Sequence, residues 1–243
     1  MKLYVIGIGP GDEKYLTIEA KRALEVCGAV AGYPLYLDLI RHLIEGKRVF
    51  ATPMRREVER CRAALGAAQS GADTALVCSG DPGIYGMASL AYELAPEYPG
   101  VEIEVIPGIS AALSGAALLG APLANDFVVI SLSDLLTPWE TIVTRLEAAA
   151  AADFAICLYN PASKKRRDYL AKACDILLRY RKPETVCGVV RNIGRAEEQS
   201  RIMGLGELRA YEADMFCTVF IGAGAAAVIH GKMVQPRGYR HGE

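Results

Sequence analysis

Short apolar runs alternate with longer segments of helical spacing along almost the whole chain, and this alternation limits the folds that it can adopt. The first run, residues 2–8, is almost uninterrupted and leads into a glycine-rich turn, which is typical of a buried parallel strand. We expect further strands at 29–32, 49–51, 74–78 and 102–106, and helices at 17–27, 35–44, 57–68, 87–94 and 109–119. Strands that alternate with helices of this length predict α/β layers with mostly parallel sheets.

The pattern stops at the segment GAPLAN, residues 120–125, and then begins again. In the second half we expect strands at 127–131, 154–159, 185–190, 201–205 and 218–222, and helices at 139–151, 164–180 and 224–230. A chain of 243 residues is long enough for one large domain or two small ones. The break therefore predicts two α/β domains, residues 1–120 and 121–243.

The charge balance argues against nucleic acid and membranes as partners. Lysine and arginine number 27 against 28 aspartates and glutamates, so no strong overall field attracts a polyanion. Residues 105–125 carry no charge, but prolines interrupt them near both ends and Ala, Ser and Gly predominate. We interpret them as a buried helix between turns. The N-terminal apolar run ends too early for a signal peptide, so we expect a cytoplasmic protein.

The cysteines and histidines do not suggest a metal site. Seven cysteines occur without any CxxC pair, and the three histidines have no ligand spacing. Cys78, Cys157, Cys187 and Cys217 each lie inside a short apolar run. We therefore expect buried, hydrophobic cysteines and no bound metal.

Three glycine-rich turns follow predicted strands, where open α/β sheets bind their ligands. In the first, GIGPGD, Asp12 replaces the last glycine of a dinucleotide fingerprint and Pro10 lacks an N–H, which disfavours a phosphate cradle. It is either a tight turn or an approach for an uncharged or cationic ligand. In the second, SGDPGIYG, Asp81 is a candidate ligand contact, although Asp-Pro-Gly is also good turn chemistry. In the third, PGISA, Ser110 either caps a helix or lets a ligand approach its N-terminus.

Taken together, GxGPGD, SGDPxxYG and PGISA resemble the tetrapyrrole methylase family. The resemblance continues through SDLLTPW from Ser133, YNPASKKR from Tyr159, VRNIGR from Val190 and DMFCT from Asp214. These later motifs are similar to the branch of the family that methylates C17 of precorrin-3B or its cobalt counterpart. The resemblance covers essentially residues 1–222.

The resemblance implies two α/β/α domains with parallel or mixed sheets and a cleft between them for S-adenosylmethionine. It implies a carboxylate-rich tetrapyrrole substrate, ring contraction during cobalamin biosynthesis, and a homodimer. Cofactor contacts are implied for Pro10, Gly80, Asp81, Tyr85, Ser110, Ala111, Tyr159, Asn160, Val190 and Thr218.

Two further sets of residues are candidates for the reaction itself. Ring contraction moves protons, so we expect an acid or base among Ser133, Asp134 and Thr137, although Ser133 and Asp134 could instead cap the following helix. Arg166 and Arg191 are candidates for binding substrate carboxylates; a solvated charged face is the alternative.

Three other functions remain open from the sequence. They are another tetrapyrrole methylase, a non-enzymatic α/β module that binds a dinucleotide or a tetrapyrrole, and a ribosomal-RNA methylase, which the absence of a basic excess disfavours.

Overall fold

The computed structural model describes residues 1–163 and 165–239, and the chain forms two compact units, Met1–Ala111 and Ala112–Glu243. The elements of the first unit are β1 (Lys2–Gly7), η1 (Glu13–Tyr15), α1 (Ile18–Val26), β2 (Ala29–Gly32), α2 (Pro34–Leu39), η2 (Arg41–Leu43), β3 (Arg48–Ala51), α3 (Glu57–Gln69), β4 (Thr74–Cys78), α4 (Ala88–Leu94), η3 (Ala95–Glu97) and β5 (Glu102–Ile106). Helix α5 (Ala111–Leu119) then leads into the second unit.

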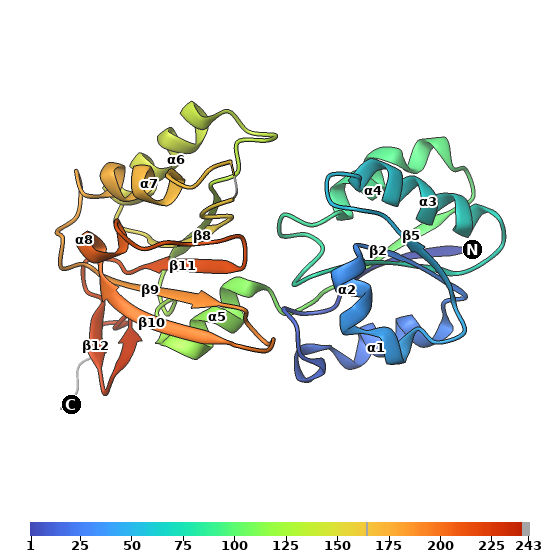
Figure 1. The fold of residues 1–243 in the computed structure, drawn as a ribbon, viewed down its shortest axis with the longest axis horizontal. Helices are drawn as coiled ribbons and strands as arrows, with labels where there is room; N and C mark the ends of the chain where they lie inside the picture. The colour runs from blue at the N-terminus through green and yellow to red at the C-terminus, as the bar shows by residue number, and fades with distance from the viewer. Residues whose placement is uncertain (164, 240–243) are drawn as a thin grey trace. The chain divides into compact units, whose positions relative to one another are not determined.

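The sheet of the first unit has the strand order β3-β2-β4-β1-β5, and every pair is parallel. Successive residues of each strand face opposite sides, so the apolar strands feed two cores. Leu3, Val5 and Leu76 pack under α3 and α4, whereas Ile6 and Val77 pack against α1 and α2. Figure 1 shows these two helix layers on either side of the sheet, which confirms the predicted α/β/α arrangement.

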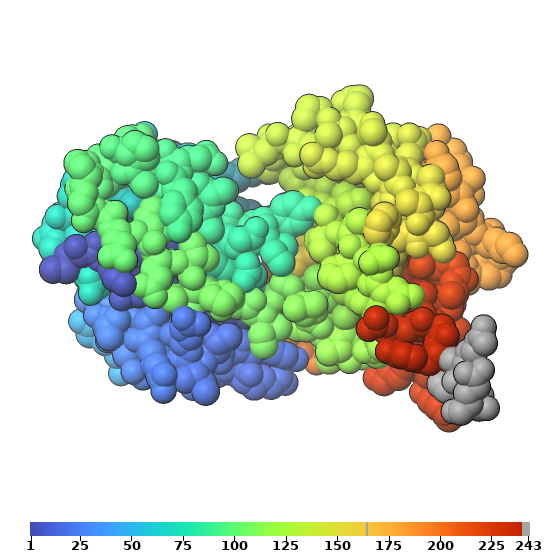
Figure 2. Space-filling view, turned by 180° about the vertical axis from the view of Figure 1, so that it is seen from behind, coloured from blue at the N-terminus to red at the C-terminus, as the bar shows by residue number. Residues whose placement is uncertain are grey.

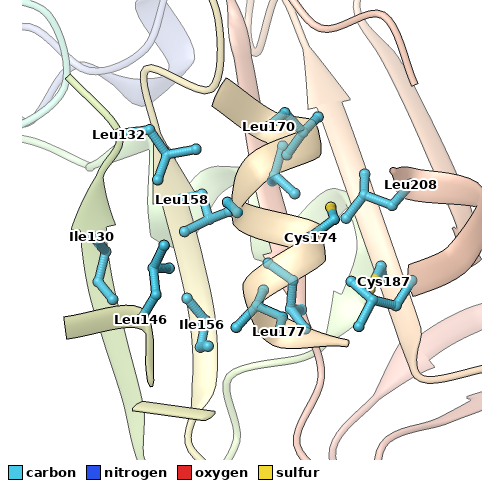
Figure 3. Close-up of a cluster of buried hydrophobic side chains, with 14 of the residues drawn as sticks. Ile130, Leu132, Leu146, Ile156, Leu158, Leu170, Cys174, Leu177, Cys187 and Leu208 are labelled. Atoms are coloured by element: carbon cyan, nitrogen blue, oxygen red, sulfur yellow. The ribbon is translucent and has the colours of Figure 1, made fainter. Parts of the chain in front are cut away.

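The second unit contains β6 (Gly120–Ala121), β7 (Phe127–Ser131), α6 (Trp139–Ala151), β8 (Ala155–Tyr159), α7 (Tyr169–Leu177), β9 (Val186–Arg191), β10 (Gln199–Gly204), α8 (Leu205–Leu208), β11 (Cys217–Ile221), β12 (Ala227–Ile229) and β13 (Lys232–Val234). Its main sheet is mixed, with the order β10-β9-β11-β8-β7. Strands β7 and β8 are parallel, while β11 is antiparallel to both β8 and β9. Figure 3 shows the core on one face, where Leu158, Leu170 and Leu177 pack between the sheet and α7.

Helix α5 and the C-terminal strands cover the other face of this sheet. Gly115 of α5 packs against the Phe220 ring, and Leu119 packs against Gly188. Strand β13 pairs in parallel with β6, and Figure 2 shows the red C-terminal segment beside the green segment that follows α5. The division between the two compact units lies between Ala111 and Ala112, directly after the first residue of α5.

One predicted helix is wrong. Residues 224–230 do not form a helix, because Ala227–Ile229 is strand β12, antiparallel to β13. The turn between the two strands contains His230 and Gly231, whose φ angles of 47° and 72° are those of a type I′ hairpin. The helix predicted at 164–180 begins in the structure at Tyr169, and its predicted first residue lies outside the described residues.

All seven cysteines are buried and free, as predicted from their apolar surroundings. Burial raises the pKa of the Cys78 thiol to about 11, so it remains protonated and unreactive at neutral pH. Within the described ranges 1–163 and 165–239, no helix combines the length and the apolar character needed to cross a membrane.

The contact between Gly115 and Phe220 predicts an unusual effect for a helical glycine. A Cβ at Gly115 would lie 2.9 Å from Cζ of the buried Phe220 and 3.1 Å from Cδ1 of Ile193. We expect Gly115→Ala to lower the free energy of unfolding by roughly 1–3 kcal/mol through overpacking. Urea denaturation measures this change.

Gly66 of α3 is the matched control, because the nearest atom to its Cβ would be 3.9 Å away. Gly66→Ala should stabilise by about 0.5–1 kcal/mol, the usual gain in a helix. If Gly115→Ala also stabilises the protein, the tight packing of α5 on Phe220 is refuted.

Candidate functional site

The turns after β1 and β4 are joined by backbone hydrogen bonds. The amide of Gly9 donates to the Gly80 carbonyl at 3.2 Å, and the amide of Gly80 donates to the Gly9 carbonyl at 2.7 Å. The Ile8 amide also donates to the carbonyl of Cys78 at 2.9 Å. Because β1 and β4 are neighbours in a parallel sheet, their carboxyl ends meet, and these bonds fix the GIGPGD and SGDPGIYG turns to each other.

The third turn, PGISA, approaches the other two more closely than a side chain would permit. A Cβ on Gly108 would lie 2.2 Å from the Gly80 carbonyl oxygen, and a Cβ on Gly7 would lie 2.6 Å from the Gly108 amide nitrogen. Real Cβ atoms do not approach backbone atoms this closely. Glycine at these positions is therefore a steric requirement of the edge, in addition to any role in binding.

Asp81 links the second and third turns. One carboxylate oxygen accepts a hydrogen bond from the Gly83 amide at 2.8 Å, and the other accepts from the Gly108 amide at 3.0 Å. A carboxylate offers about four lone-pair positions, so both oxygens retain capacity for a ligand donor. Asp81 thus builds the edge, and its predicted ligand contact is compatible with that role.

The six residues of the first unit predicted to contact a cofactor all lie on these three turns. Pro10, Gly80 and Ser110 are buried, and Asp81 and Ala111 are half-buried. Tyr85 is 56% exposed and has a φ of 54°, a left-handed conformation that is uncommon for an aromatic residue. Strained residues of this kind persist where the surrounding structure fixes them, often at ligand sites.

A second edge of the same kind lies in the second unit. Strands β7, β8 and β9 run in one direction, since β7 is parallel to β8 and β11 is antiparallel to both β8 and β9. Their last residues, Ser131, Tyr159 and Arg191, therefore lie along one edge, next to the first residue of β11, Cys217. The SDLLTPW, YNPASKKR, VRNIGR and DMFCT motifs all begin or end at this edge.

Arg166 connects the first two of these motifs. Its Nη1 donates to Ser133 Oγ at 2.7 Å and to Asp134 Oδ1 at 3.0 Å, and its Nε donates to Ser163 Oγ at 3.1 Å. The Tyr169 hydroxyl donates to the second oxygen of Asp134 at 2.5 Å. We call Ser133, Asp134, Arg166 and Tyr169 the Asp134 network.

The network keeps Asp134 ionised. The hydrogen bond from Tyr169 lowers the pKa of Asp134 most, and that from Arg166 adds to it, while partial burial opposes both. The same bond raises the pKa of the Tyr169 hydroxyl. At neutral pH Asp134 can accept a proton or stabilise a cation, but it cannot act as an acid. Ser133 and the half-buried Thr137 are the remaining donors among the predicted catalytic residues.

Tyr159 and Asn160 also form hydrogen bonds with other parts of the second unit. The Tyr159 hydroxyl accepts a hydrogen bond from the Ala112 amide at 2.9 Å, at the start of α5. The Asn160 amide donates to Ser131 Oγ at 2.9 Å, and its backbone has a φ of 53°. Both residues lie at the edge, as predicted, with Asn160 exposed and Tyr159 half-buried.

Arg191 is paired rather than isolated. Its Nε donates to Asp214 Oδ2 at 2.8 Å. Burial works to raise the pKa of Asp214, but the hydrogen bonds from Arg191 and from the Phe216 amide outweigh it and lower the pKa. Val190 and Thr218 face each other across β9 and β11, and both are buried. The backbone of Val190 also pairs with β10 in the sheet.

The sequence interpretation did not single out Tyr169, Asp214 or Ser131 as site residues. Tyr169 lies three positions after Arg166, and Asp214 is the first residue of the DMFCT motif. Their closeness to these motifs was the only sign in the sequence that they belong to the site. Their roles depend on contacts between segments far apart in the chain, 32 to 35 residues for the partners of Asp134.

The chain thus has two α/β units, with glycine-rich turns at the sheet edge of the first unit and the Asp134 network at the sheet edge of the second. Residues 2–209 match the model of the tetrapyrrole (corrin/porphyrin) methylases. The chain belongs to the tetrapyrrole methylase family, a family of methyltransferases.

Individual relatives agree with this assignment. The chain is 46% identical over 238 residues to a protein from Salmonella typhimurium named "Probable cobalt-factor III C(17)-methyltransferase", covering 98% of this chain and 99% of the relative. Its fold is similar to the crystal structure of the methyltransferase CobJ, with 36% identity, a TM-score of 0.89 and coverage of 96% and 99% of the two chains. A uroporphyrin-III C-methyltransferase from Thermus thermophilus, complexed with S-adenosylhomocysteine, shares the fold at 24% identity, with a TM-score of 0.72 and coverage of 91% and 92%.

The close approach of the three turns predicts that Gly108→Ala is poorly tolerated. The added methyl group would overlap the Gly80 carbonyl, so the turns must separate and the Asp81–Gly108 hydrogen bond must lengthen. We expect a loss of roughly 2–4 kcal/mol in the free energy of unfolding, because backbone atoms cannot move aside as a side chain can. Urea denaturation measures the loss.

Gly28→Ala is the control, because the nearest atom to its Cβ would be 3.8 Å away. It should change the free energy of unfolding by less than about 0.5–1 kcal/mol. Equal stability of the two variants would contradict the steric requirement at Gly108.

Proposed function

We propose that the protein transfers a methyl group from S-adenosylmethionine to C17 of the cobalt-containing form of precorrin-3B, with ring contraction, in cobalamin biosynthesis. The observation that carries the proposal is the direct bonding of Arg166 in YNPASKKR to Ser133 and Asp134 in SDLLTPW. These are the motifs that distinguish the C17-methylating branch. The name of the 46% identical relative favours the cobalt-containing substrate over the metal-free one.

The edge of the second unit fits a large, flat macrocycle that carries carboxylates. Leu135 and Leu136 follow β7 and are exposed, Leu136 to 98%, and Met215 and Phe216 before β11 are exposed too. Such apolar side chains offer a surface for the ring face. Lys165 and Arg167, exposed on either side of Arg166, fit the peripheral carboxylates better than Arg166 and Arg191, which are already paired with aspartates.

The edge of the first unit suits S-adenosylmethionine. Beside the Gly80 carbonyl there is no room for a Cβ on Gly7 or Gly108, so the edge is built of bare backbone at these positions. Asp81 supplies a carboxylate that is compatible with a cationic sulfonium, whereas it would repel a phosphate. We propose that Pro10, Gly80, Asp81, Tyr85, Ser110 and Ala111 bind the co-substrate, together with Tyr159, Asn160, Val190 and Thr218 of the second unit.

S-adenosylmethionine supplies an activated methyl group: the bond from C17 to the methyl carbon forms as the sulfur–methyl bond breaks, and sulfur keeps the electron pair. The chain's part in this step is chiefly alignment, which can lower the barrier by roughly 7–11 kcal/mol. In the rearrangement that contracts the ring, ionised Asp134 is suited to accept a proton and Ser133 to relay one.

The direct test is incubation with S-adenosylmethionine and either cobalt-containing or metal-free precorrin-3B. We expect one methyl group to be added to the cobalt compound, with a changed macrocycle spectrum. Turnover of the metal-free compound alone would reverse the substrate assignment. Failure with both, using folded protein and verified substrates, would refute the function.

The non-enzymatic alternative is separated by binding measurements. Calorimetric titration should give micromolar affinity for S-adenosylmethionine, and affinity for NADH without it would favour a dinucleotide-binding module. We also propose that the protein is cytoplasmic and forms a homodimer, as the family resemblance implies. Light scattering after gel filtration tests the homodimer.

Leu136→Ser tests the apolar surface at the edge of the second unit. Because the side chain is 98% exposed, the substitution should leave the melting temperature unchanged. We expect KM for the tetrapyrrole to rise roughly ten-fold, equivalent to about 1.4 kcal/mol and so to partial burial of one leucine on binding.

Ile18→Ser is the matched control, since Ile18 is 71% exposed on α1 of the first unit, at its first residue. Its KM should equal that of the unsubstituted protein. An unchanged KM in Leu136→Ser would remove Leu136 from the substrate surface.

A further inference from the structure

Tyr169 lies outside every motif used to assign the function, yet it contacts the centre of the Asp134 network. It is the first residue of α7, and its hydroxyl donates to Asp134 Oδ2 at 2.5 Å. The other oxygen of Asp134 accepts from Arg166 at 3.0 Å, so each carboxylate oxygen has one side-chain donor. Two donors on opposite oxygens fix the plane of the carboxylate as well as its position.

The ring of Tyr169 is itself well anchored. Its centroid lies 4.5 Å from that of Trp139, at a tilted angle, and the Arg166 guanidinium lies 6.0 Å from it. The next residue, Leu170, points into the core beside Leu158, and Leu132, just before Ser133, is also buried there (Figure 3). The backbones on both sides of the Tyr169–Asp134 hydrogen bond are therefore held by the same core.

We propose that Tyr169 is a positioning residue: through Asp134 it fixes the Arg166 guanidinium against Ser133 and so orients the groups that meet the tetrapyrrole. The inference rests on the proposed function, because it concerns the same site. Arg166 donates to Ser133, Asp134 and Ser163 at the same time, so its orientation depends on where the Asp134 carboxylate is held. Without the Tyr169 hydroxyl, Asp134 can rotate about its side-chain bonds and Arg166 can follow.

The charges around the network determine how it responds to pH. Among the described residues, Arg166 and Tyr169 face Asp134, and Asp168 and Lys172 also lie near Tyr169, with Lys172 Nζ 5.0 Å from the ring centroid. The Tyr169 bond is the largest influence that lowers the pKa of Asp134. The ionised form of Asp134 is therefore lost as the pH falls through this lowered pKa. Loss of the hydroxyl raises the pKa and moves the transition to higher pH.

Tyr169→Phe is the test, since it removes only the hydroxyl and keeps the ring against Trp139. We expect kcat/KM for the tetrapyrrole to fall roughly ten-fold or more, in line with the loss of a hydrogen bond to a charged group. The acidic limb of the pH–rate profile should move to higher pH, while the affinity for S-adenosylmethionine stays unchanged. In an Asp134→Asn background, Tyr169→Phe should have little further effect on kcat/KM.

Tyr180→Phe is the matched control, because Tyr180 lies just beyond the end of α7 and is 47% exposed. It should leave kinetics and pH profile unchanged. If Tyr169→Phe lowers activity only as far as its melting temperature falls, with an unmoved acidic limb, the role is structural and the proposal is overturned. Unchanged kinetics overturn it as well.

An NMR titration of the Asp134 carboxyl carbon separates this inference from the proposed function. A higher pKa in Tyr169→Phe than in the unsubstituted protein supports the coupling, and equal values overturn it. If the coupling is present but the unsubstituted protein methylates no tetrapyrrole, the proposed function fails and the positioning role fails with it.

Discussion

The first unit depends on three backbones that approach one another more closely than any Cβ would allow. The turns after β1, β4 and β5 meet at Gly7, Gly80 and Gly108, and backbone hydrogen bonds and the Asp81 carboxylate join them. The parallel order β4-β1-β5 places the three strand ends side by side, and the glycines let them converge. The sheet thus determines where the turns lie, and the lack of a Cβ in glycine determines how closely the turns approach one another.

In the second unit, side chains rather than backbone contacts join the strand ends. Its strand ends are joined by charged and hydroxyl groups, Arg166 to Asp134 and Arg191 to Asp214. An edge built of backbone is rigid, whereas an edge built of side chains can adjust to the large macrocycle that we propose as its ligand.

Much of the fold could be predicted because its strands are local features. The expected ranges 74–78, 102–106 and 127–131 coincide with β4, β5 and β7, since each is a short apolar run with turns at both ends. Strands β6, β12 and β13 were missed, because they are short and exist only through pairing with distant partners. The motifs could be recognised because each is a continuous stretch of sequence. The bonds of Asp134 with Arg166 and Tyr169 could not be predicted, because they join segments that only folding brings together.

The pairing of β6 with β13 has a consequence for the order in which the chain can fold. Every strand of the first sheet lies within Met1–Ala111, so that unit can complete its pairing before the rest of the chain leaves the ribosome. Strand β6 must wait for β13, which is synthesised nearly half a chain later. Closing so long a loop is slow, so the β6–β13 contact belongs to the final stage of folding.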